Sequence, residues 1–178
     1  MAEQFEMTSE TLAEKEAGPL EFEVFGAKTL SIEADGDANL APYTATVRIR
    51  NTSPTPVIVN YTTDPLRSFR SMAVWPTEHP GEAIEFNDCV GDQSLPTAME
   101  ETIPPRGTLL ISSWTRHHAY IWDREAPKED VVLTDLIPRD YTVRFDLALT
   151  YDRGSGATPV SEKFDIRFRS VPVVLEDN

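Results

Sequence analysis

One stretch of the sequence gathers residue types that could do metal or acid–base chemistry. It runs from Trp114 to Trp122 and contains the adjacent histidines His117 and His118. Neighbouring residues of a strand point to opposite faces, so these two imidazoles cannot easily bind one metal ion. The third histidine, His79, is distant in the sequence and precedes a proline. We therefore predict no metal ion and no catalytic residue, and an enzyme that uses His117, His118 and nearby acids is the last of three alternatives.

The same stretch is better explained as a protein contact surface. Trp114 and Trp122 would anchor the ends of two strands, with Arg116 and His117 between them. Aromatic residues and arginine are enriched at the centres of protein interfaces. We expect Trp114, Arg116, His117 and Trp122 to form contacts between subunits.

No other motif predicts a bound cofactor. The acidic pairs Asp35/Asp37 and Asp88/Asp92 flank glycines, but the first pair lacks the ligand series of a calcium loop. The chain also lacks a glycine-rich phosphate loop, a Gly-x-Ser-x-Gly nucleophile motif and a paired-cysteine metal motif. We predict that the protein uses no cofactor.

Two kinds of residue leave alternatives open. Cys89 is the only cysteine, which excludes an internal disulfide, so an inert thiol and a bridge to a second chain both stay open. Asn51 and Asn60 begin Asn-x-Ser/Thr sequons, and without a secretory signal we expect neither to be glycosylated. Asn51 would instead shape the turn that follows it.

Apolar and polar residues alternate from Leu20 onward, as they do in half-buried β-strands. The clearest alternation covers 141–151, and shorter runs include 43–50, 57–61 and 164–168. About ten short strands separated by turn residues predict an all-β protein, as an antiparallel sandwich or a closed barrel. The strand order cannot be read from the sequence. Between a jelly roll and an immunoglobulin-like sandwich, we predict a single antiparallel jelly roll.

Residues 1–19 differ from the rest, and we predict an N-terminal arm followed by one β-barrel domain over 20–178. The arm is acidic and polar, with Phe5 among its few large apolar residues. Thr8 or Ser9 could cap a short helix that ends near Lys15. Chain ends are loose unless something holds them. We therefore expect the arm with Phe5, and the loop region 76–105, to contact a neighbouring subunit.

The charge is strongly negative, with 30 acidic and 16 basic residues and a net charge of −14. Such a chain is a poor partner for nucleic acid or for an anionic membrane surface, because both attract clustered lysine and arginine. It has no apolar run of about 20 residues that could span a bilayer, and no signal peptide, so we expect synthesis in a cytoplasm. Molar salt shortens the Debye length to about 3 Å and would screen the self-repulsion, which predicts a high-salt environment.

The arginines of the predicted strands have two interpretations. Charge compensation is the simpler one, since only four of the 16 basic residues are lysines. Pairing between subunits is the other, because an arginine fork binds a carboxylate with two parallel hydrogen bonds. The residues concerned lie on or beside strands and face solvent: Arg67, Arg70, Arg116, Arg144, Arg167 and Arg169.

The size, the excess of arginine over lysine, the polar arm and the strand ladder from Leu20 to Val174 together resemble one viral family. They are similar to the small major capsid proteins of haloarchaeal icosahedral viruses with an internal membrane, which have a vertical single β-barrel. The resemblance implies a capsid subunit that associates with itself and with a larger companion capsid protein. It also implies a location in the virion near the viral membrane, with Cys89 as a candidate cross-link.

A second resemblance is local. The segments 47–59, 103–108 and 136–143 are similar to intracellular proteinase-inhibitor domains, which have an immunoglobulin-like sandwich. Those domains usually show a Pro-Gly step before the final Tyr-x-Val strand, where this chain has Pro138-Arg139-Asp140. This resemblance implies the alternative function, a cytoplasmic protein-binding module.

Overall fold

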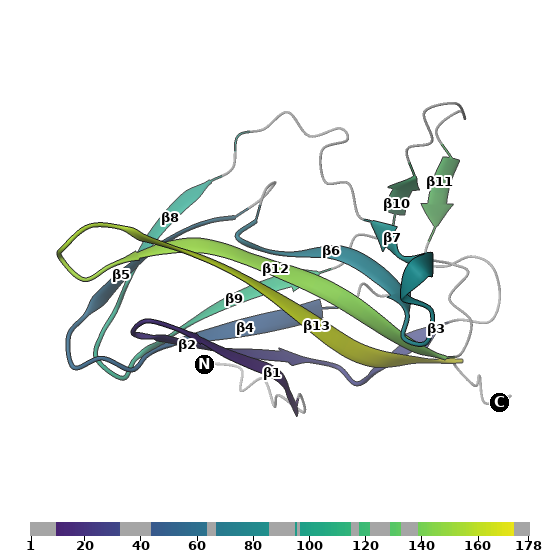
Figure 1. Cartoon of the computed structure of the whole chain (residues 1–178), viewed down its shortest axis with the longest axis horizontal. Helices are drawn as coiled ribbons and strands as arrows, with labels where there is room; N and C mark the ends of the chain where they lie inside the picture. The colour runs from purple at the N-terminus through teal and green to yellow at the C-terminus, as the bar shows by residue number, and fades with distance from the viewer. Residues whose placement is uncertain are drawn as a thin grey trace, which may run out of the picture.

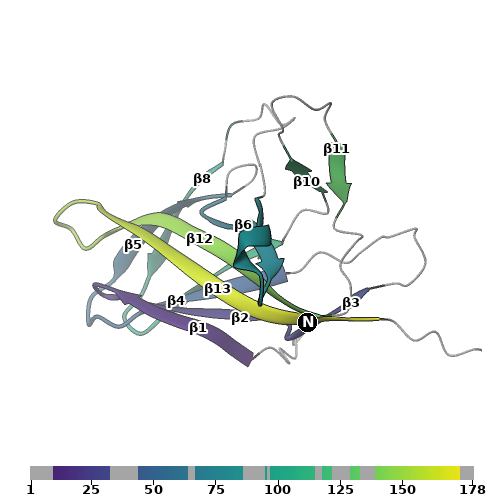
Figure 2. The ribbon, with the colours of Figure 1, turned by 45° about the vertical axis from the view of Figure 1, so that its right-hand side comes forward.

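The structure is a computed structural model, and it describes residues 10–32, 44–63, 67–85, 95, 97–114, 118–121, 129–132 and 139–172. The described residues form two main β-sheets that pack in separate layers (Figure 1, Figure 2). Within these ranges, no helix is long and apolar enough to cross a membrane.

The smaller of the two layers is a four-stranded sheet in the order β1-β2-β4-β9, and all its pairs are antiparallel. Its strands are β1 (Glu10–Ala17), β2 (Leu20–Gly26), β4 (Thr44–Asn51) and β9 (Thr108–Trp114). A separate pair consists of β10 (His118–Ile121) and β11 (Glu129–Val132).

The larger layer is a seven-stranded sheet with the main order β3-β13-β12-β5-β8. Its strands are β3 (Thr29–Ile32), β5 (Val57–Thr62), β6 (Phe69–Pro76), β7 (Ile84–Glu85), β8 (Ala98–Ile103), β12 (Asp140–Asp152) and β13 (Thr158–Pro172). A 3-10 turn, η1 (Pro80–Glu82), follows β6. Strands β5 and β6 pair with successive parts of the same edge of β12, and β3 pairs with β13 in parallel.

The prediction of an all-β antiparallel sandwich is confirmed, but the jelly-roll topology is wrong. The neighbours β2-β4-β9 in one sheet and β5-β12-β13 in the other match the ABE and CFG strands of an immunoglobulin sandwich. The physical reason for the error is that alternation fixes which side chains of a strand face inward. It does not fix which strands are neighbours.

The inward-facing side chains of both sheets form one apolar core. Phe69 stacks on Phe145 with ring centroids 5.0 Å apart, and Phe164 meets Phe69 edge-on at 6.4 Å. Burying such a side chain contributes roughly 1.5–3 kcal/mol. Other fully buried members come from both layers: Leu20, Phe22, Val24, Val47, Ile49, Val57, Leu147 and Ile166.

Asn51 joins the turns at one end of the sandwich, as the sequence predicted for its own turn. Its buried side-chain nitrogen donates to the carbonyls of Thr55 at 2.8 Å, Ile103 at 3.1 Å and Pro104 at 3.2 Å. Its side-chain oxygen accepts from the backbone N–H of Ser53 at 2.9 Å and from the Ser53 hydroxyl at 2.7 Å. The β4–β5 turn is thereby tied to the β8–β9 turn.

The short helix predicted in the N-terminal arm is wrong, because residues 10–17 form strand β1. Glutamate and lysine are good helix formers, but pairing with β2 overrides that weak local preference. The side chain of Lys15 reaches from β1 to β13 and pairs with Glu162 at 3.0 Å. The division into an arm 1–19 and a domain 20–178 stays a prediction, since residues 1–9 lie outside the described ranges.

Candidate association surfaces

The contact residues predicted from the sequence are mostly outside the described part of the chain. Trp114 is the last residue of β9, where its backbone is paired with Thr44 of β4. The other five are not described: Phe5, Cys89, Arg116, His117 and Trp122. Within the described ranges, no group of three or more histidine, cysteine, aspartate or glutamate residues could hold a metal ion.

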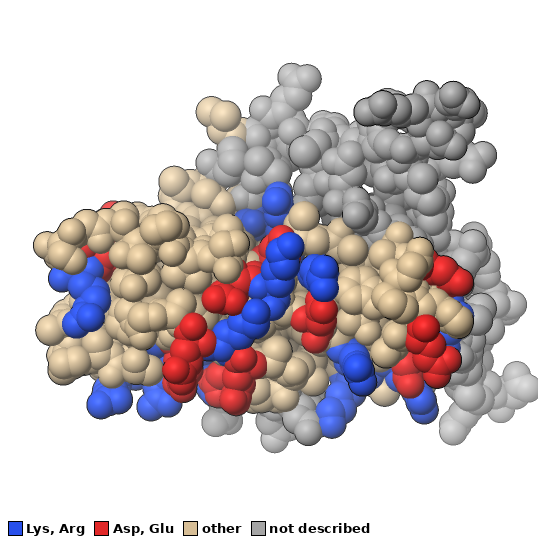
Figure 3. Space-filling model, viewed as in Figure 1, with Lys and Arg blue, Asp and Glu red and all other residues tan. Residues whose placement is uncertain are grey.

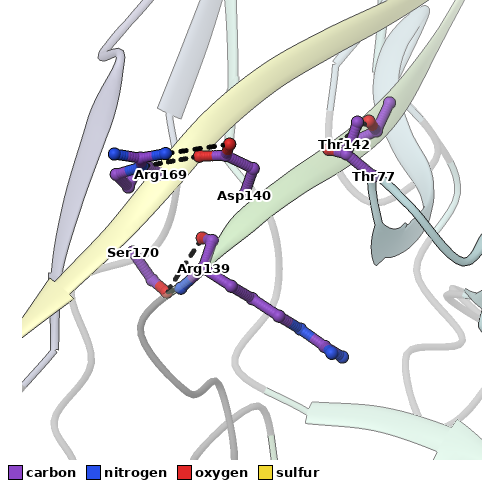
Figure 4. Close-up of polar contacts among 6 residues, drawn as sticks. All are labelled: Thr77, Arg139, Asp140, Thr142, Arg169 and Ser170. Carbon is purple, nitrogen blue, oxygen red and sulfur yellow. Dashed lines mark hydrogen bonds and ion pairs between the residues drawn. The ribbon is translucent and has the colours of Figure 1, made fainter.

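The outer face of the seven-stranded sheet carries ordered ion pairs between β12 and β13. Arg144 donates to both carboxylate oxygens of Asp165, at 2.7 and 2.8 Å. Arg169 binds Asp140 in the same way, at 2.7 and 3.0 Å (Figure 4). For these two arginines, the structure supports charge compensation within the chain.

Each of the two bidentate pairs shifts the pKa of at least one of its members. The hydrogen bond from Arg169 lowers the pKa of the Asp140 carboxyl, and the hydrogen bond to Asp165 raises the pKa of Arg144. These shifts in pKa favour the charged forms of Asp140 and Arg144, and each bidentate pair holds its arginine in a defined position on the sheet.

Three further cationic side chains belong to this face and have no ion pair within the described residues. Arg70 of β6 and Lys163 of β13 both lie opposite Asp146 of β12, and Arg167 lies opposite Thr142. One buried carboxylate oxygen of Asp146, Oδ1, has no hydrogen-bond partner in the described part of the chain.

We call the part of this surface that lies on β6, β13 and residues 140–146 of β12 the basic face. Its five cationic residues are Arg70, Arg144, Lys163, Arg167 and Arg169, and its three carboxylates are Asp140, Asp146 and Asp165. This part has a net charge of +2, but Asp152 of β12 and Glu100 of β8 lie on the same side of the sheet, so the described charges of the whole outer face balance. Figure 3 shows blue and red side chains together over the strands β12 and β13.

The outer face of the four-stranded sheet has the opposite excess, and we call it the acidic face. Its members are Glu14 and Glu16 of β1, Glu21 and Glu23 of β2, and Arg48 and Arg50 of β4. Arg48 pairs with Glu23, and Arg50 approaches Glu21 at 3.6 Å. Four carboxylates and two guanidinium groups leave a net charge of −2.

A shallow uncharged hollow lies at the end of the seven-stranded sheet. It has a volume of about 510 Å³ and is lined by residues of β5, β8, β12 and β13, with Ser68. Asn60, Thr62 and Thr150 contribute polar groups, and Ala98 and Pro159 contribute apolar ones. Burial and the nearby carboxylate of Glu101 raise the pKa of Tyr61 at its rim. The sequence did not reveal this hollow, because its lining comes from four strands whose pairing the sequence does not show.

No family model matches the sequence, and no curated protein matches it. Among solved structures, the chain is similar to AggA, the major subunit of the aggregative adherence fimbriae type I of Escherichia coli. The identity is 11%, the match covers 86% of this chain and 97% of that chain, and the TM-score is 0.41.

The expectation of a viral capsid subunit from a high-salt environment is wrong. The likeness found is to a fimbrial subunit, and the sheet order is immunoglobulin-like instead of jelly-roll. The expectations of a larger capsid partner, of a nearby viral membrane and of a location in a virion are therefore wrong as well. An acidic composition and a strand ladder are properties that unrelated β proteins share. The cytoplasmic proteinase-inhibitor-like alternative is set aside too, although its expected strand order is the one observed.

Proposed function

We propose that this chain is a structural, non-enzymatic subunit that associates with further copies of itself. The observation that carries the proposal is the basic face, where five cationic side chains accompany three carboxylates on a chain of net charge −14. The rest of the chain therefore carries a net charge of −16. A local excess of positive charge attracts anionic surfaces within about one Debye length.

The acidic surface of another copy is the partner that this chemistry fits. Exposed Lys163 and Arg167 have no ion pair within the described residues, so they are available to carboxylates of a neighbour. The forks of Arg144 and Arg169 hold the rest of the face in order, which reduces the conformational entropy lost on association.

The contact residues predicted from the sequence belong to the same proposal. Phe5, Cys89, Trp114, Arg116, His117 and Trp122 would add contacts between copies beyond the charged faces. Cross-linking at Cys89 would appear as a dimer on non-reducing electrophoresis.

The proposal predicts concentration-dependent association of the full chain. Sedimentation velocity at an ionic strength of about 0.15 M, where the Debye length is about 8 Å, should show a mean mass that rises with protein concentration. Replacing Lys163→Gln together with Arg167→Gln should shift that rise to higher concentration, because two cations of the basic face are lost.

The matched control is Arg106→Gln with Arg153→Gln, which removes the same charge from exposed turn positions. The control variant should associate nearly as strongly as the unchanged protein. It should associate at least as strongly as the variant that lacks Lys163 and Arg167. A chain that sediments as a monomer at every concentration and salt would contradict the proposed function.

A further inference from the structure

We infer that β9 of one copy pairs with β9 of a second copy in antiparallel orientation, so that two four-stranded sheets become one continuous sheet. This inference rests on the proposed self-association and names a further surface for it. Strand β9 is the outer strand of the sheet β1-β2-β4-β9, where β4 pairs with one of its two edges (Figure 1). A free strand edge is a template for another strand, because its backbone groups on that side lack partners.

The sequence of β9 lacks the residues that protect a free edge. Its seven residues, Thr-Leu-Leu-Ile-Ser-Ser-Trp, include no charged residue, no proline and no glycine. By contrast, four of the eight residues of β1 and two of the six residues of β8 are charged. Charges and prolines at an edge discourage pairing with another chain, whereas uncharged segments of high β-propensity favour it. Among these three edge strands, β9 is therefore the one most open to a second copy.

Two hydrogen bonds of β4 show which backbone groups of β9 face the free edge. The N–H of Asn51 donates to the Gly107 carbonyl at 3.0 Å, whereas the N–H of Thr52 donates to the Pro19 carbonyl, on the side of β2, at 2.8 Å. Bonding groups of successive residues point to opposite sides of a strand. Residues 109, 111 and 113 therefore bond to β4, and 108, 110 and 112 direct their N–H and C=O groups to the free edge. Within the described residues, no group bonds to the backbone of 110 or 112 on that side.

The side chains of β9 suit a flat contact between strands. Leu110 is 55% exposed, and Thr108 and Ser112 are exposed on the same outer face of the sheet. On the opposite face, Ile111 is buried in the core. The edge therefore offers small hydroxyl groups and one large apolar side chain on its outer face, with no charge that would need a counter-ion.

The occupant that this edge fits is the same edge of a second copy. An antiparallel pair related by a two-fold axis needs only one kind of surface. A register centred on Ile111 pairs the whole strand with itself, and it places Leu110 opposite the partner's Ser112. These are residues whose backbone groups face the free edge, and no like charges meet. Trp114, which the sequence predicts as a contact residue, ends the same strand.

Salt distinguishes this contact from a contact made by ion pairs. Two chains of net charge −14 repel each other over about 30 Å in 0.01 M salt and over about 3 Å in molar salt. Pairing through β9 involves no ion pair, so screening removes the repulsion and weakens nothing in the contact. Association through β9 should therefore strengthen steadily up to molar salt, where exposed ion pairs between copies would be screened.

A pair of substitutions tests the contact. In the edge variant, Leu110→Lys with Ser112→Lys, lysines of the two copies would lie directly opposite each other, which is unfavourable. The matched control is Ile58→Lys with Ser161→Lys, which makes the same changes of charge at exposed positions on β5 and β13. Sedimentation velocity in molar salt should show a dimerisation constant at least about tenfold lower for the edge variant than for the control. Circular dichroism checks that both variants keep the sandwich.

Amide hydrogen exchange of the unchanged protein gives a second test that needs no substitution. The amides of Leu110 and Ser112 should exchange at least about tenfold more slowly when most of the protein is associated than when it is dilute, because they gain partners. The Thr97 carbonyl accepts from Thr63 at 2.9 Å, so by the same alternation the N–H of Glu100 faces the free edge of β8. That amide should keep its exchange rate and serves as the control.

The outcomes separate this inference from the proposed function. Pairing through β9 is overturned when the unchanged chain associates but the amides of Leu110 and Ser112 exchange as fast as in the dilute protein. It is also overturned when the folded edge variant dimerises as strongly as the control. In both cases the proposed self-association survives and uses another surface. A chain that is monomeric at every concentration and salt overturns both.

Discussion

At the scale of single residues, Asn51 does the most to fix the structure of the sandwich. Its side chain has no exposed surface and connects its own turn to the carbonyls of Ile103 and Pro104, 52 and 53 residues away. A buried amide that satisfies several backbone groups is costly to remove, since each abandoned group keeps its desolvation penalty. The first Asn-x-Ser/Thr sequon therefore begins with a structural residue, inaccessible in the folded chain.

We expect Asn51→Ala to lower the free energy of unfolding by about 3 kcal/mol or more, because three carbonyls and one N–H lose their buried partner. Urea denaturation followed by tryptophan fluorescence measures the change. Asn60→Ala is the control, since Asn60 lines the open hollow and is only half-buried. Similar losses for the two variants would show that the network at Asn51 contributes little.

The sequence predicted the behaviour of some residues and not of others, for physical reasons. Asn51 was assigned to a turn from its local chemistry, which the neighbouring residues determine. The forks of Arg144 and Arg169 depend on which residue lies opposite in β13, and that register is a property of the paired strands. Both arginines were expected to face solvent, but the choice between compensation and intersubunit pairing required their partners.

At the scale of elements, the β1–β2 hairpin shows how one turn is fitted to the opposite sheet. Gly18 has a φ of +57°, and a Cβ at this position would stand 2.3 Å from the Tyr151 hydroxyl oxygen of β12. Only glycine satisfies both the backbone conformation and the close approach. The hairpin is therefore seated against the end of β12 by its turn, while Lys15 attaches its strand to β13.

We predict that Gly18→Ala destabilises the protein by about 2 kcal/mol or more, from left-handed strain of roughly 1–2 kcal/mol together with the steric contact. In a Tyr151→Phe background the same change should cost less, because the hydroxyl that the new methyl meets is gone. A double-mutant cycle by thermal or urea unfolding measures the difference. Equal costs in both backgrounds would remove the steric part of this argument and leave only backbone strain.

The strands with the strongest local sequence pattern were predicted correctly, and a strand without such a pattern was not. The alternation at 141–151 and 164–168 is the strongest in the sequence, and these residues lie in β12 and β13 with the expected face inward. Strand β1 was mistaken for a helix because its sequence, Glu-Thr-Leu-Ala-Glu-Lys-Glu-Ala, consists largely of good helix formers. Its strand conformation comes from β2, and pairing between strands is not visible in a local window.

At the scale of the whole molecule, the distribution of charge matters more than its total. The net charge of −14 predicts a protein that repels anions, but a sum does not show where the charges lie. The sandwich sorts them, placing a net −2 on the outer face of the four-stranded sheet, whereas the described cations and carboxylates on the outer face of the seven-stranded sheet balance. The candidate association surfaces are therefore a property of the fold, and no run of basic residues in the sequence indicates where they lie.

The overall charge leads to a prediction about stability. We expect the free energy of unfolding to increase as sodium chloride rises from about 0.01 M to about 1 M, because the Debye length falls from about 30 Å to about 3 Å. Exposed ion pairs are also weakened, but each contributes only about 0–1 kcal/mol. Thermal unfolding at low protein concentration measures the trend. The increase in the free energy of unfolding with salt should be smaller for Glu100→Gln with Glu101→Gln, because this variant has a lower net negative charge. An equal or larger increase in that variant would contradict the explanation.

The position of β13 has a consequence for how the protein is made. This last described strand lies inside its sheet, between β3 and β12, and supplies Phe164 and Ile166 to the core. It also holds Glu162, to which the first described strand is attached through Lys15. A growing chain on the ribosome cannot complete its core before these late residues have left the exit tunnel. Folding of this sandwich therefore follows synthesis of nearly the whole sequence, and until then its earlier strands expose apolar faces to the chaperones of the cell.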